Sequence, residues 1–130
     1  MNTTFKDLGL IEYKSAWDYQ ESLLAENVKI KSDSRKEGKD ANPFSLPTKH
    51  YLLFCEHPVV YTLGKSGNID NVLLSDSELK EKEISFFRTN RGGDITFHGP
   101  DQIVGYPILD LEKFFTDIGK YLRNLEEVII

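Results

Sequence analysis

The sequence predicts an α+β fold for a single domain that spans residues 1–130. Three observations lead to this prediction. Short apolar and aromatic runs, typical of strands, recur between prolines and glycines. Two longer segments, one toward each end of the chain, carry apolar residues at helical spacing. A chain of 130 residues that is 39% hydrophobic and 28% charged is ordinary for one globular domain.

The N-terminal part of the chain is expected to form a strand, a helix and a loop. Residues 3–13 are predicted to be a strand broken by a glycine. Apolar residues at helical spacing then predict an amphipathic helix over residues 15–30, with Ser15 as its N-cap. Residues 31–48 are polar, contain a glycine and are interrupted twice by proline. They are interpreted as a polar loop insertion, either a functional lid or a simple insertion.

The remainder is expected to alternate short strands with helical turns. Residues 69–82 mix leucines with charged residues and predict one or two such turns. From Asp110 onward, apolar residues at helical spacing predict a C-terminal helix. This helix reaches Ile130 without a cap or polar tail, which indicates that the natural domain continues. Strands are expected at residues 50–57, 59–67, 84–90, 94–98 and 102–109.

Composition excludes several classes of protein. The net charge of −5 argues against a general nucleic-acid-binding protein, which presents a basic face. Cys55 is the one cysteine, so an internal disulfide is excluded, and no Cys/His spacing suggests a metal site. The N-terminus does not resemble a secretory signal, and no apolar run approaches the roughly 20 residues that cross a bilayer. A cytoplasmic chain without membrane, metal or cofactor is therefore expected.

The stretch from Asn90 to Leu111 is the least generic part of the sequence, because it places Arg91, two glycines and His98 close together. Adjacent glycines let the backbone approach a ligand closely. The arginine supplies a fixed charge and the histidine an exchangeable proton. Backbone N–H groups here are suited to a carbonyl oxygen that gains negative charge. The alternative is a glycine-rich hairpin with a solvated arginine.

Two segments together resemble a known family. LLFCEHPVVYTLGKSG (52–67) and RGGDITFHGPDQIVGYPILDL (91–111) are similar to motifs of the octanoyl (lipoyl) transferases of lipoate biosynthesis. Those enzymes carry Glu-His-Pro-x-Val-Tyr-Thr-Leu-Gly and, further along, Arg-Gly-Gly-x-x-Thr-x-His-x-Pro-Gly-Gln ending in Tyr-Pro. Tyr13 and Trp17-x-x-Gln20 fit the N-terminal pattern of the family too. The resemblance spans nearly the whole chain, in the right order, and corresponds to the N-terminal portion of such an enzyme.

The resemblance implies a biotin/lipoate protein ligase-like catalytic domain, a mixed sheet flanked by helices. It implies transfer of an octanoyl group from octanoyl-acyl carrier protein to a lysine of lipoyl domains. The acceptors are subunits of oxoacid dehydrogenase complexes or the glycine-cleavage carrier protein. Transfer proceeds through a thioester on an enzyme cysteine whose nucleophilicity a nearby lysine maintains. The substrate-binding residues implied are Arg91, Gly92, Gly93, Asp94, Ile95, Thr96, Phe97 and His98.

The chain departs from the family in two places. The family's catalytic cysteine and lysine lie beyond the segment that ends at Ile130, so no catalytic residue is assigned in this chain. Cys55 lies on a predicted buried strand and is expected to pack as a small apolar residue, so the chain alone is predicted to be inactive. Asp101 stands where the family motif has glycine, and its carboxylate either tightens the turn or weakens the fit of the substrate.

Two other functions remain open on the sequence. One is an ATP-dependent lipoate–protein ligase. Such ligases share the fold, but their motif has a longer run of glycines than the two adjacent glycines of this chain. The other is a non-catalytic module that binds acyl groups or carrier proteins. Among residues near the motifs, His57 is interpreted as structural, Lys65 as solvated, and Tyr106–Pro107 as shaping the sheet beneath the site.

Overall fold

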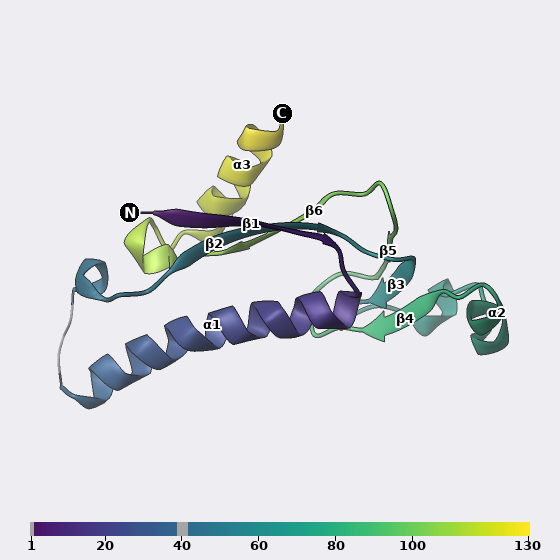
Figure 1. Cartoon of the computed structure of the whole chain (residues 1–130), viewed down its shortest axis with the longest axis horizontal. Helices are drawn as coiled ribbons and strands as arrows, with labels where there is room; N and C mark the ends of the chain where they lie inside the picture. The colour runs from purple at the N-terminus through teal and green to yellow at the C-terminus, as the bar shows by residue number, and fades with distance from the viewer. Residues whose placement is uncertain (1, 39–41) are drawn as a thin grey trace.

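The computed structural model describes residues 2–38 and 42–130. Within them, two three-stranded sheets are accompanied by helices (Figure 1). Each sheet contains both parallel and antiparallel pairs, which confirms the predicted α+β class with mixed pairing, although in two sheets rather than one. The elements are β1 (Thr3–Leu10), α1 (Tyr13–Lys36), β2 (His50–Glu56), β3 (Val60–Leu63), α2 (Asp76–Glu81), β4 (Ser85–Arg88), β5 (Ile95–His98), β6 (Val104–Ile108) and α3 (Ile118–Ile129).

The first sheet has the order β1-β2-β6, and its central strand carries the core of the molecule. Along β2, Tyr51, Leu53 and Cys55 are buried, so every second side chain points to the same covered face. Leu23 of α1 packs with Tyr51 and Leu53, together with partly buried Tyr106 of β6. The helix therefore covers one face of this sheet, as the lower layer in Figure 1 shows.

The second sheet has the order β4-β3-β5. Its strands are short, and β5 pairs antiparallel with β3, not with β6. The two strands on either side of Gly99–Pro100 therefore belong to different sheets and do not form a hairpin with each other. The local sequence stabilises α2, because Ser75 and Glu78 form a reciprocal capping box at its start. Leu79 is the buried residue of this six-residue helix.

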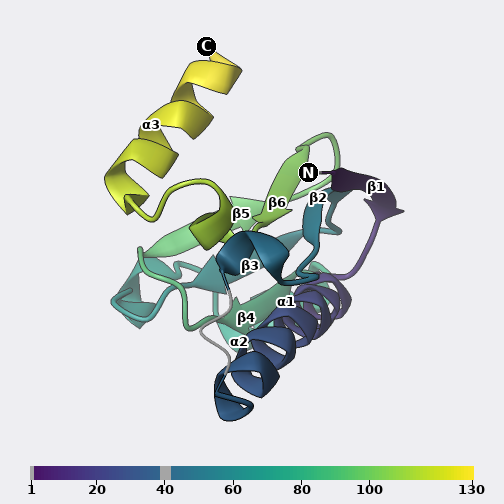
Figure 2. The same cartoon turned by 90° about the vertical axis from the view of Figure 1, so that its left-hand side faces the viewer.

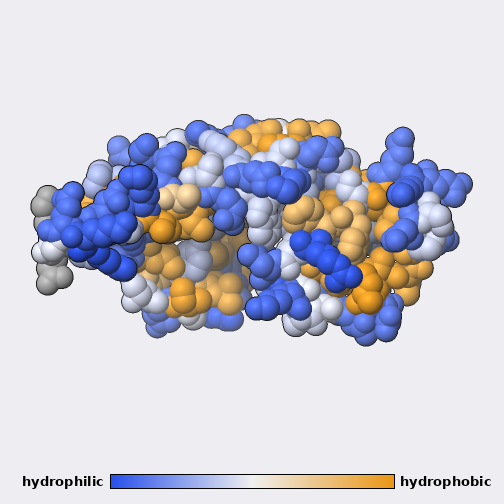
Figure 3. All heavy atoms as spheres, turned by 90° about the horizontal axis from the view of Figure 1, so that it is seen from below, coloured by the Kyte–Doolittle hydropathy of each residue, from blue (hydrophilic) through white to orange (hydrophobic). Residues whose placement is uncertain are grey.

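Helix α1 is longer than the sequence suggests. It begins at Tyr13 rather than after Ser15 and continues to Lys36, so the interpretation of residues 31–36 as loop is wrong. Tertiary contacts hold the added turns, because the ammonium of Lys31 binds the carboxylates of Asp110 and Glu112 across the fold. Of the predicted loop, residues 39–41 lie outside the described residues. Figure 3, seen from below, shows hydrophilic residues over much of this side of the molecule.

The C-terminal helix is shorter than predicted. Residues 111–113 form a single 3-10 turn, and α3 begins only after Asp117, whose side chain accepts a hydrogen bond from the backbone N–H of Lys120 at 2.9 Å. Phe114 and Phe115 therefore lie outside the helix on which they were expected. Among the described residues, none of the helices combines the length and apolar character that crossing a bilayer requires.

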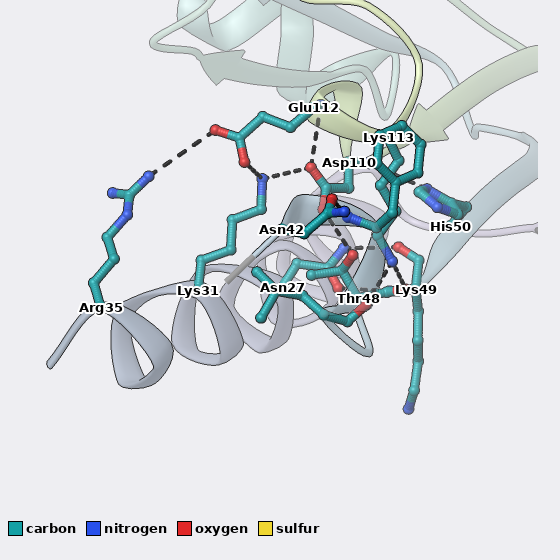
Figure 4. A network of polar contacts seen from close by, with 12 residues as sticks. Asn27, Lys31, Arg35, Asn42, Thr48, Lys49, His50, Asp110, Glu112 and Lys113 are labelled. Carbon is teal, nitrogen blue, oxygen red and sulfur yellow. Dashed lines mark hydrogen bonds and ion pairs between the residues drawn. The ribbon is translucent and has the colours of Figure 1, made fainter. Parts of the chain in front are cut away.

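A polar network joins α1 to the segment before β2 and to the segment after β6 (Figure 4). Asp110 is buried, and its carboxylate accepts hydrogen bonds from Lys31 and from the hydroxyl of Thr48. The side-chain amide of Asn27 bonds in both directions with the backbone of Lys49, at 2.8 Å each. Buried polar groups are tolerated when they are paired in this way, so the network fixes the far end of α1.

Candidate functional site

Two glycine-containing loops, one after β3 and one before β5, lie directly against each other. The backbone N–H of Gly64 donates to the carbonyl of Asp94 at 3.1 Å, and that of Lys65 donates to the carbonyl of Arg91 at 2.8 Å. A Cβ on Gly64 would lie 2.1 Å from the carbonyl oxygen of Gly93, a distance that no side chain can occupy. Glycine at this position is therefore a requirement of the close approach between the loops.

Asp94 faces the first of these loops. Its carboxylate accepts a hydrogen bond from the backbone N–H of Asn68 at 3.2 Å and from the side-chain amide of Asn71 at 2.5 Å. An ionised carboxylate that bonds two groups of a neighbouring loop restrains that loop. Asp94 therefore holds the loop after β3 in place through these two hydrogen bonds.

The side chain of Arg91 lies across the second sheet. Its Nη2 donates to the hydroxyl oxygens of Thr62 and Thr96, each at 3.2 Å, and its Nη1 donates to the carbonyl of Gly92 at 2.8 Å. The two threonines are directly opposite each other on β3 and β5. Because the rigid guanidinium is held at several points while the residue remains exposed, its positive charge has a fixed and accessible position.

An aromatic and histidine cluster lies next to this arginine, under the start of α1. The ring of Tyr13 stacks on that of His98, with centroids 6.0 Å apart and an interplanar angle of 15°. His57 and Phe87 each lie 5.2 Å from the same tyrosine ring. Burial raises the pKa of Tyr13, and the neighbouring charge of Arg91 only partly opposes this effect. The phenol of Tyr13 is therefore protonated at neutral pH and available as a hydrogen-bond donor.

His57 is fully buried at the junction of the two sheets. Its Nδ1 lies 2.7 Å from the carbonyl oxygen of Ile11, which can only accept, so Nδ1 carries the proton. In the neutral imidazole Nε2 is then the acceptor, and it lies 2.8 Å from the hydroxyl of Tyr106, which donates. Burial raises the pKa of Tyr106, so this hydroxyl keeps its proton for that bond. The histidine joins the segment before α1 to β6, in agreement with the structural role expected from sequence.

Cys55 lies beneath the cluster and is 3% exposed. Its sulfur is 3.6 Å from Nε2 of His57, a weak contact for a thiol. Burial, and then the charge of Asp7, raise the pKa of the thiol, so the nucleophilic thiolate is disfavoured. The position therefore has the properties expected of a packing residue.

The eight predicted site residues do not share one surface. Residues 91–94 are exposed, and Thr96 and His98 of β5 face Arg91 and α1. Ile95 and Phe97 alternate to the other face of the strand, where the ring of Phe97 lies 5.4 Å from that of Tyr61. The structure thus brings together the arginine, the threonine and the histidine, and separates the apolar members of the run from them.

Other residues of the cluster were not predicted as part of the site. Four residues belong to this group: Tyr13, His57, Thr62 and Tyr106. All of them stand in segments that carry the family resemblance, so the resemblance is the sequence signal from which they could have been predicted. Among residues 2–38 and 42–130, no group of three or more His, Cys, Asp or Glu side chains is placed to hold a metal ion.

Comparison with known proteins decides the family. A family model described as the lipoyl protein ligase A/B catalytic domain matches residues 12–130. The chain belongs to this family. The resemblance drawn from the two motifs, and the predicted ligase-like catalytic fold, are thereby confirmed.

Similar curated members of the family carry one name. The chain is 58% identical over 125 residues to an octanoyltransferase of Christiangramia forsetii, and 59% identical over 125 residues to one of Flavobacterium johnsoniae. These matches cover 96% of the chain but 51% and 52% of the two relatives. A third octanoyltransferase, of Flavobacterium psychrophilum, is 57% identical and matches the whole chain. The chain therefore spans about half the length of the curated relatives it matches.

Asp101, which stands where the resembled motif has glycine, has a backbone conformation that glycine adopts readily. Its φ is 69°, in the left-handed region, and its N–H donates to the Glu56 carboxylate at 2.7 Å. Short polar side chains tolerate this conformation and β-branched ones do not. We expect Asp101→Val to lower the free energy of unfolding by about 1–2 kcal/mol, and Asp101→Gly to change it by less than about 0.5 kcal/mol. Urea unfolding of both variants checks this; equal stabilities would contradict it.

The histidines make stability depend on pH. Burial, then His57 and Arg91, lower the pKa of His98, and burial and Lys113 lower that of His50. In the unfolded chain a histidine binds a proton near pH 6.5. In the folded chain His98 and His50 bind a proton only at lower pH. Their neutral forms therefore contribute fully to the free energy of unfolding above pH 6.5. This contribution is lost as the pH falls through the lower folded pKa values.

We therefore expect the free energy of unfolding to decline from pH 7 toward pH 5. Urea titrations at several pH values measure this, and His98→Gln is expected to make the decline shallower. An NMR titration that placed the pKa of His98 above 6.5 would contradict the explanation.

Proposed function

We propose that the chain provides the acyl-binding part of an octanoyltransferase. In this reaction an octanoyl group moves from octanoyl-acyl carrier protein to a lysine of a lipoyl domain, by way of a cysteine thioester. The acceptors are lipoyl domains of oxoacid dehydrogenase complexes or the glycine-cleavage carrier protein. The observation that carries the proposal is the guanidinium of Arg91, fixed by Thr62 and Thr96 beside Tyr13 and His98.

The loop next to Arg91 is open to a ligand. A Cβ on Gly92 would meet no atom within 4 Å, so an acyl group can lie against the backbone there. A thioester carbonyl gains negative charge as it is attacked, and preorganised donors stabilise that charge. We assign this role to Arg91 and the adjacent backbone. The protonated phenol of Tyr13 is a further donor on the same side.

The nucleophile has a different source. Cys55 is buried and its thiol has a raised pKa, which supports the view that it does not attack the thioester. We assign the nucleophile and its neighbouring lysine to the part of the relatives outside the matched residues. The chain alone is then expected to show no octanoyl adduct after incubation with octanoyl-acyl carrier protein. Intact mass spectrometry tests this, and a stable adduct on Cys55 would overturn the assignment.

Arg91→Met tests the proposed site. The assay uses a chimera in which the unmatched residues of the Flavobacterium johnsoniae relative follow Ile130. We expect the parent chimera to transfer octanoyl to a lipoyl domain and Arg91→Met to lower kcat/KM roughly 100-fold, the usual effect of removing a donor to a developing oxyanion. Lys80→Met, on the exposed side of α2, serves as the control and should be near parental. Equal activity of both variants, or a folded parent chimera without transfer, would contradict the proposal.

ATP binding separates this proposal from an ATP-dependent ligase, since the family description covers both kinds of enzyme. We expect titration of the chain and of the chimera with ATP to give no binding heat. A saturable ATP site would favour the ligase.

A further inference from the structure

Helix α3 presents an unusually apolar surface. At about 100° per residue, the five aliphatic residues of the helix fall within one arc of about 120°: Ile118, Leu122, Leu125, Val128 and Ile129. We call this arc the α3 face. Ile118 is 65% exposed, Leu122 49%, and Val128 and Ile129 about 85%. Figure 2 shows the helix standing clear of the sheets. Contiguous apolar surface of this kind marks an interaction site.

The first sheet has an uncovered apolar side on the same side of the molecule. Core residues of β2 point toward α1, so Leu52 and Phe54 point the other way. Phe5 pairs with Leu52 in register and therefore lies on the same side of the sheet. Phe5 is 57% and Phe54 38% exposed, and their rings meet edge to face at 5.3 Å. Figure 1 shows α1 below this sheet and α3 above it. Helix α3 and this side of the sheet thus lie on the same side of the molecule.

A shallow cavity lies at the base of α3. Its volume is about 190 Å³, and its lining is apolar except for Asn124. Phe114 and Phe115 contribute from the segment before the helix, and Tyr121 and Leu125 from the helix itself. A groove with apolar walls on a helix and a neighbouring segment is suited to the apolar face of another chain segment.

We propose that the α3 face is the docking surface for the second half of the catalytic domain, the part that the relatives carry outside the matched residues. The relatives are about twice as long as the match, so each has about as much chain again to place. A second copy of the chain fits less well. A 12-residue helix is about 18 Å long and 10 Å wide. Pairing of two such helices falls short of the roughly 800 Å² per partner of a stable interface.

The test compares one substitution in two contexts. Leu122→Lys is made in the 130-residue chain and in the chimera that carries the remaining residues of the Flavobacterium johnsoniae relative. In the chain alone Leu122 is half exposed, so we expect Tm to change by less than about 2 °C. In the chimera a buried lysine should lower Tm by roughly 5–10 °C. Glu127→Lys, on the opposite side of the helix, is the matched control and should change Tm little in both.

If the chimera with lysine does not fold, Leu122→Ala provides a milder version of the same comparison. Equal Tm changes in the two contexts would overturn the proposal. So would a 130-residue chain that elutes as a dimer and becomes a monomer on Leu122→Lys, because a second copy would then be the occupant. The readout is thermal stability, so its failure is distinct from a failure of octanoyl transfer.

Discussion

Replacing Gly64 by alanine is expected to lower the free energy of unfolding by about 3–5 kcal/mol, since overpacking costs 1–3 kcal/mol and each lost hydrogen bond about 1 kcal/mol. The new Cβ would lie 2.1 Å from the carbonyl oxygen of Gly93 and 2.9 Å from that of Gly92. Both contacts are with backbone, so no side chain can rotate away. The loop before β5 must move, and the bonds from Gly64 and Lys65 to that loop are lost.

The same displacement is expected to remove the proposed acyl site, because Arg91 belongs to the loop that moves. Gly92→Ala is the matched control. A Cβ there meets no atom within 4 Å, and the backbone of Gly92 is not in the left-handed region. Its stability should stay within about 0.5 kcal/mol of the parent. Urea unfolding compares the two variants, and a Gly64→Ala protein as stable as Gly92→Ala would show that the loops are not in close contact.

The sequence predicts the strands of this fold better than the ends of its helices. Strand β2 is a short apolar run, so its own residues are enough to predict a buried strand. The last turns of α1 are polar, and they are stabilised by carboxylates 79 and 81 residues further along the chain. Such contacts leave no periodic signal. Helix α3 begins later than the sequence predicts, because the N-cap of Asp117 outweighs the apolar spacing of Phe114 and Phe115.

Only part of the site can be predicted in the same way. Arg91 and His98 stand in one contiguous motif whose glycines indicate a close backbone approach. Their neighbours are Tyr13 at the start of α1, His57 just after β2, and Tyr106 on β6, and only the packing of the two sheets brings them together. Successive side chains of β5 also point to opposite faces of the strand, so Thr96 and His98 lie on the side of Arg91 while Phe97 lies on the other side.

The polar network around Asp110 provides the second large expected effect. The side chain of Asp110 has no exposed surface, and its carboxylate accepts from Lys31, from the hydroxyl of Thr48 at 2.7 Å and from the backbone N–H of Glu112 at 3.3 Å. Asp110→Ala leaves the hydroxyl and the N–H without this acceptor. Lys31 is 23% exposed and keeps its 2.9 Å ion pair with Glu112, so part of the loss is offset.

We therefore expect Asp110→Ala to lower the free energy of unfolding by about 2–3 kcal/mol, below the range for breaking a fully buried ion pair. The control is Asp33→Ala, which removes the 2.6 Å ion pair of Asp33 with Lys29 on α1, where the lysine is largely and the aspartate about half exposed. Surface pairs of this kind contribute about 0–0.5 kcal/mol. Urea unfolding at pH 7 measures both variants, and equal effects would show that burial does not strengthen the Asp110 contacts.

Acid provides an independent check of the same network. Burial alone would raise the pKa of Asp110, but the hydrogen bonds from Lys31 and Thr48 outweigh it and lower that pKa. A carboxyl with a lowered folded pKa stabilises the fold above its unfolded value, near pH 3.9, and the contribution is lost as the pH falls through the folded value. The stability difference between the parent and Asp110→Ala should therefore be constant from pH 7 to about pH 5 and shrink below pH 4. A difference that persisted at pH 2 would mean that the charge of Asp110 does not carry the effect, and that lost packing does.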